Sequence, residues 1–189
     1  MLIQTLSPDN YQHVPWKNGG GVTTTIASEK RQGVEGWAGI LWQLGRTKIV
    51  TPAPFSDLTG FERLQVVIGG SGLVLETPEG EINLREAFLP VRYDGGTPIT
   101  SRLENGPVEV VNLIASRDFC AIDLIVLRKG EKVLLPAARH ILLAPEAPAG
   151  IGIDGQEHPL AMNHALAFEG AAQVYLHHGV ILVASIKPR

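Results

Sequence analysis

Short apolar runs recur along the chain, each bounded by glycine, proline, asparagine or aspartate. They are rich in β-branched residues, which favours strands over helices. The predicted strands cover Ile40–Leu44, Leu64–Ile68, Leu73–Leu75, Val108–Ile114, Ile122–Leu127, Val133–Leu135, Ile141–Ala144 and Val180–Ile186. Glycine and proline interrupt nearly every window of helix length. The pattern therefore predicts an all-β fold, with one short helical turn near Ser7–Asn10, where Ser7 caps and Pro8 begins the turn.

The chain also matches itself at a fixed offset. Gly80 matches Gly155, which lies 75 positions later, and Tyr93–Gly95 matches Phe168–Gly170 at the same spacing. Strand, turn and closing strand thus occur twice in the same order. Such self-similarity indicates duplicated supersecondary units.

One segment stands out for its chemistry. Residues 15–26 read PWKNGGGVTTTI, so Trp16, Lys17 and Asn18 are followed by three glycines and a strand-like run. Ordering three glycines loses much backbone entropy, which a fold accepts where φ is positive or where backbones approach closely. Lys17 and Asn18 beside bare N–H groups would make a compact site for a carboxylate. The alternative is a flexible turn before a strand.

This segment resembles the opening motif of the HutD/Ves family, bacterial cupin-like proteins linked to histidine utilisation. The resemblance runs from about Ile3 to the C-terminus. Two looser blocks support it. The first comprises Trp42, Pro54-Phe55-Ser56, Gly60, Arg63 and Leu64–Gly72. The second comprises Gly106-Pro107-Val108 and Asn112-Leu113.

The chain departs from the family pattern at several positions. Gln43 stands where the family has arginine, Gly45 where it has serine, and Thr59 where it has proline. Val110-Val111-Asn112 lacks the aspartate that precedes Leu-Asn in the family. Because an arginine is missing, we expect weaker binding of dicarboxylates than of monocarboxylates.

Together, the resemblance and the repeat predict a bicupin, with two small antiparallel β-barrels at residues 1–115 and 116–189 in one compact chain. Cupins often hold a metal through a His-x-His…Glu…His set, whose side chains converge on one ion. No His-x-His occurs here, and the first half contains only His13. His177 and His178 are adjacent, so on a strand they point to opposite faces. We therefore expect no metal and no cofactor; a site using His140 and one of that pair is the alternative.

The candidate ligand-binding residues lie in the first half of the chain. The predicted set is Trp16, Lys17, Asn18, Gln43, Phe55, Arg63 and Asn112. Lys17 is a point-charge donor, Arg63 can grip a carboxylate through two hydrogen bonds, and the aromatic residues, with Trp42, would form apolar walls. Structural alternatives are that Arg63 pairs with Glu62 or Glu86 on the surface, that Trp42 is core and that Asn112 fixes a loop.

Two functions of different class follow. The first is binding of a small anionic metabolite, with a regulatory or accessory role in histidine utilisation; the resemblance implies urocanate, formylglutamate or formate as candidates. The second is a metal-free isomerase or hydrolase acting on a small carboxylic acid. Acid–base groups for it are few, namely Lys17, Tyr93 and Glu62. The residues that face Lys17 and Arg63 distinguish the two, because catalysis needs a titratable partner there.

Composition limits the kinds of partner that the protein is expected to bind. The net charge is −3 and lysine and arginine are scattered, so the sequence shows no basic cluster that would bind nucleic acid. We find no apolar run of membrane-spanning length and no signal peptide at the N-terminus. The single cysteine, Cys120, is expected to be structural and fits a reducing cytoplasm. We expect a cytoplasmic monomer or homodimer whose partner is a small anion.

Overall fold

A computed structural model, which describes residues 1–16 and 19–189, confirms the all-β class. The helical segments in these ranges are two short 3-10 turns, η1 (Pro8–Asn10) and η2 (Trp37–Gly39). In η1 the Ser7 hydroxyl accepts from the Asp9 backbone N–H at 3.4 Å, as the predicted cap requires. The strands are β1 (Ile3–Leu6), β2 (Gln12–Pro15), β3 (Gly21–Lys30), β4 (Ile40–Ile49), β5 (Phe61–Gly69), β6 (Leu73–Thr77), β7 (Gly80–Leu84), β8 (Val91–Asp94), β9 (Thr100–Leu103), β10 (Val108–Ser116), β11 (Cys120–Arg128), β12 (Lys132–Leu143), β13 (Ala149–Ile153), β14 (Gln156–Leu160), β15 (Ala165–His178) and β16 (Val180–Pro188).

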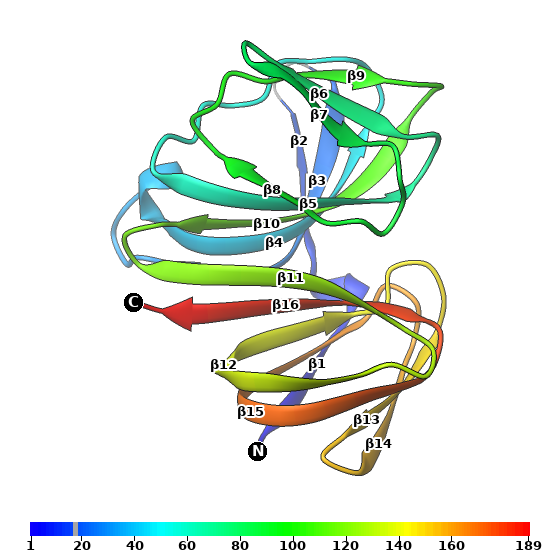
Figure 1. The fold of residues 1–189 in the computed structure, drawn as a ribbon. Coiled ribbons are helices and arrows are strands. Elements are labelled where there is room, and N and C mark those ends of the chain that lie inside the picture. Colours follow the sequence, from blue (N-terminus) through cyan, green and yellow to red (C-terminus); the bar gives the residue numbers. More distant parts are fainter. Residues whose placement is uncertain (17–18) are drawn as a thin grey trace. The chain divides into compact units, whose positions relative to one another are not determined.

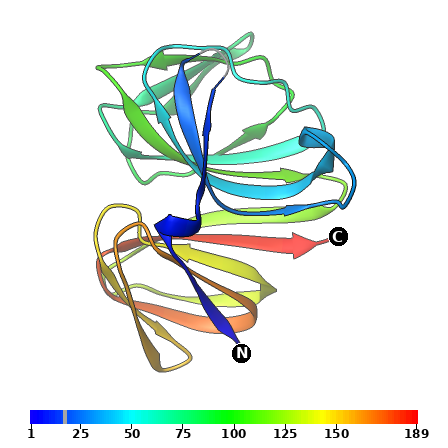
Figure 2. The same cartoon turned by 180° about the vertical axis from the view of Figure 1, so that it is seen from behind.

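The chain forms two compact units, one of residues 11–120 and the other of residues 1–10 and 121–189. The sequence repeat had placed residues 1–10 in the first half. In the structure β1 pairs antiparallel with β15 (Figure 2). Ile3 lies opposite Phe168 in this pair. Partly buried Ile3 packs against the apolar core of the second unit, which explains why the first residues belong there.

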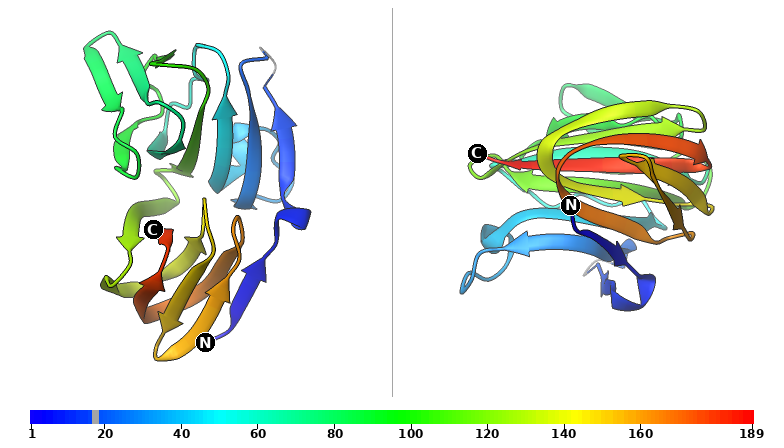
Figure 3. Two further views of the ribbon diagram at one scale, coloured as in Figure 1. Left: turned by 90° about the vertical axis from the view of Figure 1, so that its right-hand side faces the viewer. Right: turned by 90° about the horizontal axis from the view of Figure 1, so that it is seen from below.

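The unit of residues 11–120 contains two sheets (Figures 1 and 3). The six-stranded sheet has the order β2-β3-β4-β10-β5-β8, and the three-stranded sheet has the order β7-β6-β9. Apolar side chains from both sheets form one core cluster, which includes Ile49, Val67, Leu73, Leu84 and Val110. The sandwich forms because each sheet must bury its apolar face against another layer.

The other unit is built on one seven-stranded sheet. Its order is β11-β16-β12-β15-β13-β14, and β1 adds to β15. The core lies along β12, β13, β15 and β16, where Leu142, Ile151, Val174 and Val183 are fully buried.

The prediction of two closed barrels is not confirmed, because these sheets are open and keep edge strands such as β2, β8 and β14. In the first unit the chain turns at Gly95–Gly96, directly after β8, so β9 pairs with β6 rather than extending the larger sheet. The Gly95 N–H donates to the Phe61 carbonyl, and an added Cβ at Gly95 would lie 2.6 Å from the Leu58 oxygen. This tight corner splits the unit into two sheets.

The pairing order nevertheless recurs between the units. β5 pairs with β8 and β10, and β12 pairs in the same way with β15 and β16. The hairpin β6–β7 corresponds to β13–β14, and their turns contain Gly80 and Gly155, both with positive φ. The matched glycines of the sequence therefore mark equivalent turns.

Candidate functional site

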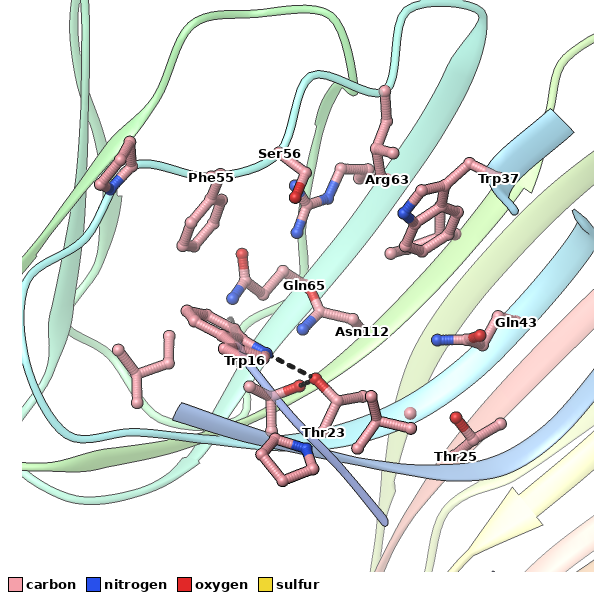
Figure 4. A pocket seen from close by; sticks show the side chains of 18 residues that line it. Trp16, Thr23, Thr25, Trp37, Gln43, Phe55, Ser56, Arg63, Gln65 and Asn112 are labelled. Atoms are coloured by element: carbon pink, nitrogen blue, oxygen red, sulfur yellow. Dashed lines mark hydrogen bonds between the residues drawn. The ribbon is translucent and has the colours of Figure 1, made fainter. Parts of the chain in front are cut away.

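A cavity of about 580 Å³ lies on one face of the six-stranded sheet. We call it the Arg63 pocket, after the ionisable side chain among its described lining residues (Figure 4). The lining consists of Val14, Pro15, Trp16, Thr23, Thr25, Trp37, Gln43, Gly45, Thr47, Ile49, Pro54, Phe55, Ser56, Leu58, Arg63, Gln65, Asn112 and Ile114.

Strand register explains how residues distant in sequence reach this pocket. In one row across β4, β10 and β5, Gln43 lies opposite Ile114, which lies opposite Arg63. In the next row on the same face, Thr25, Gly45, Asn112 and Gln65 follow one another across β3, β4, β10 and β5. Alternate residues of a strand share a face, so these two rows form the pocket floor.

Arg63 is the charged centre of the floor. The residue is only 7 % exposed, and its guanidinium carbon lies 4.8 Å from the Phe55 ring centroid and 5.1 Å from that of Tyr93. Among the described residues, no carboxylate forms an ion pair with it. The alternative pairing with Glu62 is wrong, because Glu62 points to the other face of β5 and binds Arg92 at 2.5 Å.

Tyr93 connects Arg63 to the neighbouring amide. Its hydroxyl donates to Gln65 Oε1 at 2.6 Å, so the Gln65 NH₂ group faces away from Tyr93. Burial raises the pKa of Tyr93 to about 12, although the nearby Arg63 charge lowers it. Tyr93 is therefore protonated at neutral pH and serves to orient Gln65 rather than to accept protons.

Three polar atoms at the floor lack hydrogen-bond partners in the part of the chain that the structure describes. They are Arg63 Nε, Gln65 Nε2 and Asn112 Oδ1. Gln65 is fully buried and Asn112 is 8 % exposed. Leaving a buried donor or acceptor unpaired costs about 1–3 kcal/mol. Three such atoms therefore leave hydrogen-bonding capacity unused around one cavity.

Aromatic side chains form one wall. Trp16 Nε1 donates to the Thr23 hydroxyl at 2.9 Å, and Thr23 contacts the Thr47 hydroxyl at 3.1 Å. The Trp16 and Phe55 rings meet edge to face with their centroids 6.2 Å apart. Phe55 also lies against Arg63, so the indole, the phenyl ring and the guanidinium hold one another in place.

The glycine run positions this wall. A Cβ at Gly21 would lie 2.5 Å from the Lys48 carbonyl on β4 and 3.4 Å from the Trp16 ring. Gly19 has a φ of 70° and donates its N–H to the Trp16 carbonyl at 3.1 Å. The glycines therefore meet both needs foreseen from the sequence, a positive φ and a close backbone approach.

Five predicted site residues line the cavity: Trp16, Gln43, Phe55, Arg63 and Asn112. Their role in ligand binding stays a prediction. Lys17 and Asn18 lie outside the described residues. Trp42 does not line the pocket; it alternates with Gln43 on β4, is 3 % exposed and donates to Glu29 at 3.0 Å. Its alternative role as a core residue is the one found.

Sequence reasoning missed several lining residues. They are chiefly Thr23, Thr25, Thr47, Gln65 and Trp37. Thr47 and Gln65 had a usable signal. Alternate residues of a strand share a face, and these two lie four positions after Gln43 and two positions after Arg63, respectively. Trp37 had none, since η2 comes from an irregular segment.

The histidines form no metal site in the described ranges, where no three His, Cys, Asp or Glu side chains gather. His140, a considered ligand, is fully buried. Its Nε2–H donates to the Pro136 carbonyl and its Nδ1 contacts the Ser185 hydroxyl, both at 2.9 Å. His177 contacts Glu157 at 2.7 Å. In the same ranges, no helix is long and apolar enough to cross a membrane.

Comparisons with known proteins agree on one family. The HutD family profile matches residues 8–182. A Pseudomonas putida protein, described as an uncharacterized 21.2 kDa protein in the hutC 3′ region, is 25% identical over 169 residues, which cover 89% of this chain and 87% of that protein.

Solved structures match the fold over nearly the whole chain. HutD from Pseudomonas fluorescens SBW25, crystallised in a formate condition, is 25% identical with a TM-score of 0.84 and full coverage of both chains. The conserved protein PA5104 of Pseudomonas aeruginosa PAO1 has a TM-score of 0.86 at 24% identity, over 99% of this chain and 100% of that one. YlbA from E. coli shares the fold with a TM-score of 0.71 at 10% identity, over 99% of this chain and 91% of that one.

Proposed function

The chain belongs to the HutD family, and from this premise we propose that it binds a small anionic metabolite in the Arg63 pocket as an accessory or regulatory protein of histidine utilisation in the cytoplasm. The link to this pathway rests on the family name and on the P. putida relative that lies beside hutC.

One observation carries the proposal. Arg63 is a buried cation with an unpartnered Nε, and no carboxylate of the described residues neutralises it. A buried charge that no opposite charge neutralises is unfavourable. A guanidinium is planar and offers two parallel donors, which suits a carboxylate. The Gln65 NH₂ group adds a third donor two residues along the same strand.

The lining favours binding over catalysis. Apart from Arg63, the described lining side chains are apolar, hydroxyl or amide groups. Glu62 faces away from the cavity and Tyr93 is protonated. General acid–base catalysis needs a titratable group within hydrogen-bond distance of the substrate, and the described lining supplies none with a suitable pKa.

Urocanate, formylglutamate and formate are the ligands to test first; urocanate and formate have one carboxylate, and formylglutamate, which has two, is expected to be the weakest of the three. Formate is the smallest carboxylate, and the P. fluorescens HutD was crystallised in a formate condition. A pocket of about 580 Å³ also admits larger acids, with the Trp16 and Phe55 rings available for apolar parts of the ligand.

The test is a thermal-shift screen with these three acids, followed by calorimetry with the best one. A ligand at a hundred times its Kd stabilises the fold by about 2.7 kcal/mol, which gives a measurable rise in Tm. Truncating one member of a buried charged pair costs about 2–5 kcal/mol in binding. We therefore expect Arg63→Met to weaken binding at least tenfold, and from the sequence motif alone we expect the same of Lys17→Ala.

Arg92→Ala is the matched control, since Arg92 pairs with Glu62 on the other face of the sheet. It should bind like the parent. If Arg63→Met and Lys17→Ala both bind as tightly as the parent while melting normally, the ligand binds elsewhere and the glycine-rich segment has only a structural role.

A further inference from the structure

We propose that the Arg63 pocket selects acids with one carboxylate and a neutral polar head group, such as a carboxamide, over the matching dicarboxylates. This inference rests on the proposed function, because it assumes that the carboxylate binds at Arg63. It adds what the opposite end of the same pocket recognises.

The two ends are set by strand register. Arg63 and Gln43 face the same side of the sheet in one row, with the apolar Ile114 between them. Their strands are two spacings apart, so their backbones are separated by about 9.6 Å. Figure 4 shows Gln43 and Thr25 on the far side of Asn112 from Phe55 and Trp16. A ligand can therefore contact both ends at once.

The end at Gln43 is polar and uncharged. Gln43 offers an amide, Thr25 a hydroxyl, and Trp37 closes this part of the lining. An amide both donates and accepts hydrogen bonds, as does a hydroxyl. A carboxamide or hydroxyl head group matches these partners. A second carboxylate would lose its hydration there without meeting a cation among the described lining residues.

The floor between the ends carries Gly45 and Asn112. Gly45, in the row of Thr25 and Asn112, has no side chain that projects into the pocket, and a Cβ there would press on the Thr23 methyl group at 3.2 Å. Asn112 Oδ1, without a partner among the described residues, lies in the same row and can accept from an N–H or O–H of the ligand. The pocket thus offers a donor end, an acceptor at the centre and a neutral end.

The experiment compares acids of equal length that differ only in their second end. We would measure glutaramate against glutarate, and adipamate against adipate, by calorimetry at pH 7. In each pair the monoamide should bind at least tenfold more tightly. Gln43→Arg should reverse the order by adding a cation at the neutral end. Gln43→Met, which is uncharged and similar in size, should lose the preference for the amide without gaining affinity for the diacid.

The outcomes separate the two proposals. Equal or tighter binding of the diacids to the parent overturns the selectivity but leaves carboxylate binding in place. A loss of affinity in Lys17→Ala that is larger for the diacid than for its monoamide also overturns it, because the second carboxylate would then be held by Lys17. If no acid binds, formate included, both proposals fail. Thermal melts of both Gln43 variants verify that they are folded.

Discussion

Tyr93 has a pKa of about 12 because it is buried, and this gives a pH dependence to stability. The folded pKa lies above the unfolded value of about 10. Between these two values the unfolded chain has lost a proton that the folded chain keeps. The contribution of Tyr93 is therefore fully present below pH 10 and is lost as the pH rises toward 12, by about 1.4 kcal/mol per pH unit.

We expect urea unfolding between pH 9 and pH 11 to show a steeper loss of stability in the parent than in Tyr93→Phe. At pH 7 the variant should be less stable by about 1–3 kcal/mol, because Gln65 Oε1 loses its donor. Burial also raises the pKa of Tyr11 to about 12, but both proteins share that residue. Parallel pH profiles of the two proteins would contradict the assignment.

Single residues also show how far the sequence led to the site. Arg63 and Gln43 were found from a family motif, and Phe55 lies beside them in the same block. Gln65 was missed because a glutamine inside an apolar strand carries no signal until its neighbours are known. Its role depends on Tyr93, which is remote in sequence and pairs with Arg63 through β8. Such cross-strand contacts cannot be derived from local pattern.

At the scale of elements, β5 and β12 occupy equivalent positions but carry different chemistry. Arg63 on β5 lies between Ile114 and Tyr93. His140 on β12 lies between Ser185 and Phe168 in the same arrangement. Arg63 has an unpartnered Nε among the described residues, whereas both His140 nitrogens have partners. The repeat therefore places the proposed binding residue in one unit and a structural residue in the other.

Removing the His140 ring should destabilise the protein without affecting carboxylate binding. His140→Ala leaves a cavity beside Phe168, whose ring centroid is 5.2 Å away, and deprives the Pro136 carbonyl of its donor. We expect a loss of about 2–4 kcal/mol in urea unfolding, with ligand affinity within twofold of the parent. The exposed His177→Ala is the control, with a loss below about 1 kcal/mol. A drop in affinity for His140→Ala, measured under conditions where the variant is fully folded, would contradict this division of roles.

The strands that are rich in apolar residues were predictable, whereas the short strands β1, β2, β7, β8, β9, β13 and β14 were not predicted. Each predicted apolar run falls within a strand or ends one residue past it, because β-branched alternation and turn residues are local signals. Two predictions, Val133–Leu135 and Ile141–Ala144, proved to be parts of the single long strand β12, whose register shifts between Leu135 and Ala138. β15 was missed because alanine and glycine dominate its first half. Its identity comes from pairing with β12, β13 and β1.

At the scale of the molecule, the all-β class followed from the pattern of apolar runs and the cupin-like class from the resemblance, whereas sheet closure could not be predicted. Whether β8 continues into β9 depends on the corner at Gly95–Gly96, where backbone contacts with Leu58 and Phe61 fix the turn. In the other unit β15 runs through Gly170 and pairs with β12 on both sides of it, with a register shift directly after Gly170. The sequence shows similar Tyr/Phe-acid-Gly triplets at both places, so only the tertiary contacts separate a corner from a continuous strand.

Metal content is a property of the whole purified protein, and we expect no stoichiometric transition metal. Such ions prefer imidazole, thiolate and carboxylate ligands that converge from neighbouring strands. In the described ranges no three such side chains gather, and the Arg63 pocket presents a guanidinium, amides and hydroxyls instead. A cation at Arg63 would also repel a metal ion nearby.

Elemental analysis of the purified protein should therefore find well below one iron, manganese, zinc or nickel per chain. Dialysis against EDTA should change neither the Tm nor the affinity for the best carboxylate, because binding relies on Arg63 and neutral hydrogen-bonding groups. A metal retained at one ion per chain, whose removal abolishes carboxylate binding, would show that the ligand is held through the ion. The loss of affinity in Arg63→Met would then have to be explained by a change in metal content, which the same elemental analysis of that variant would reveal.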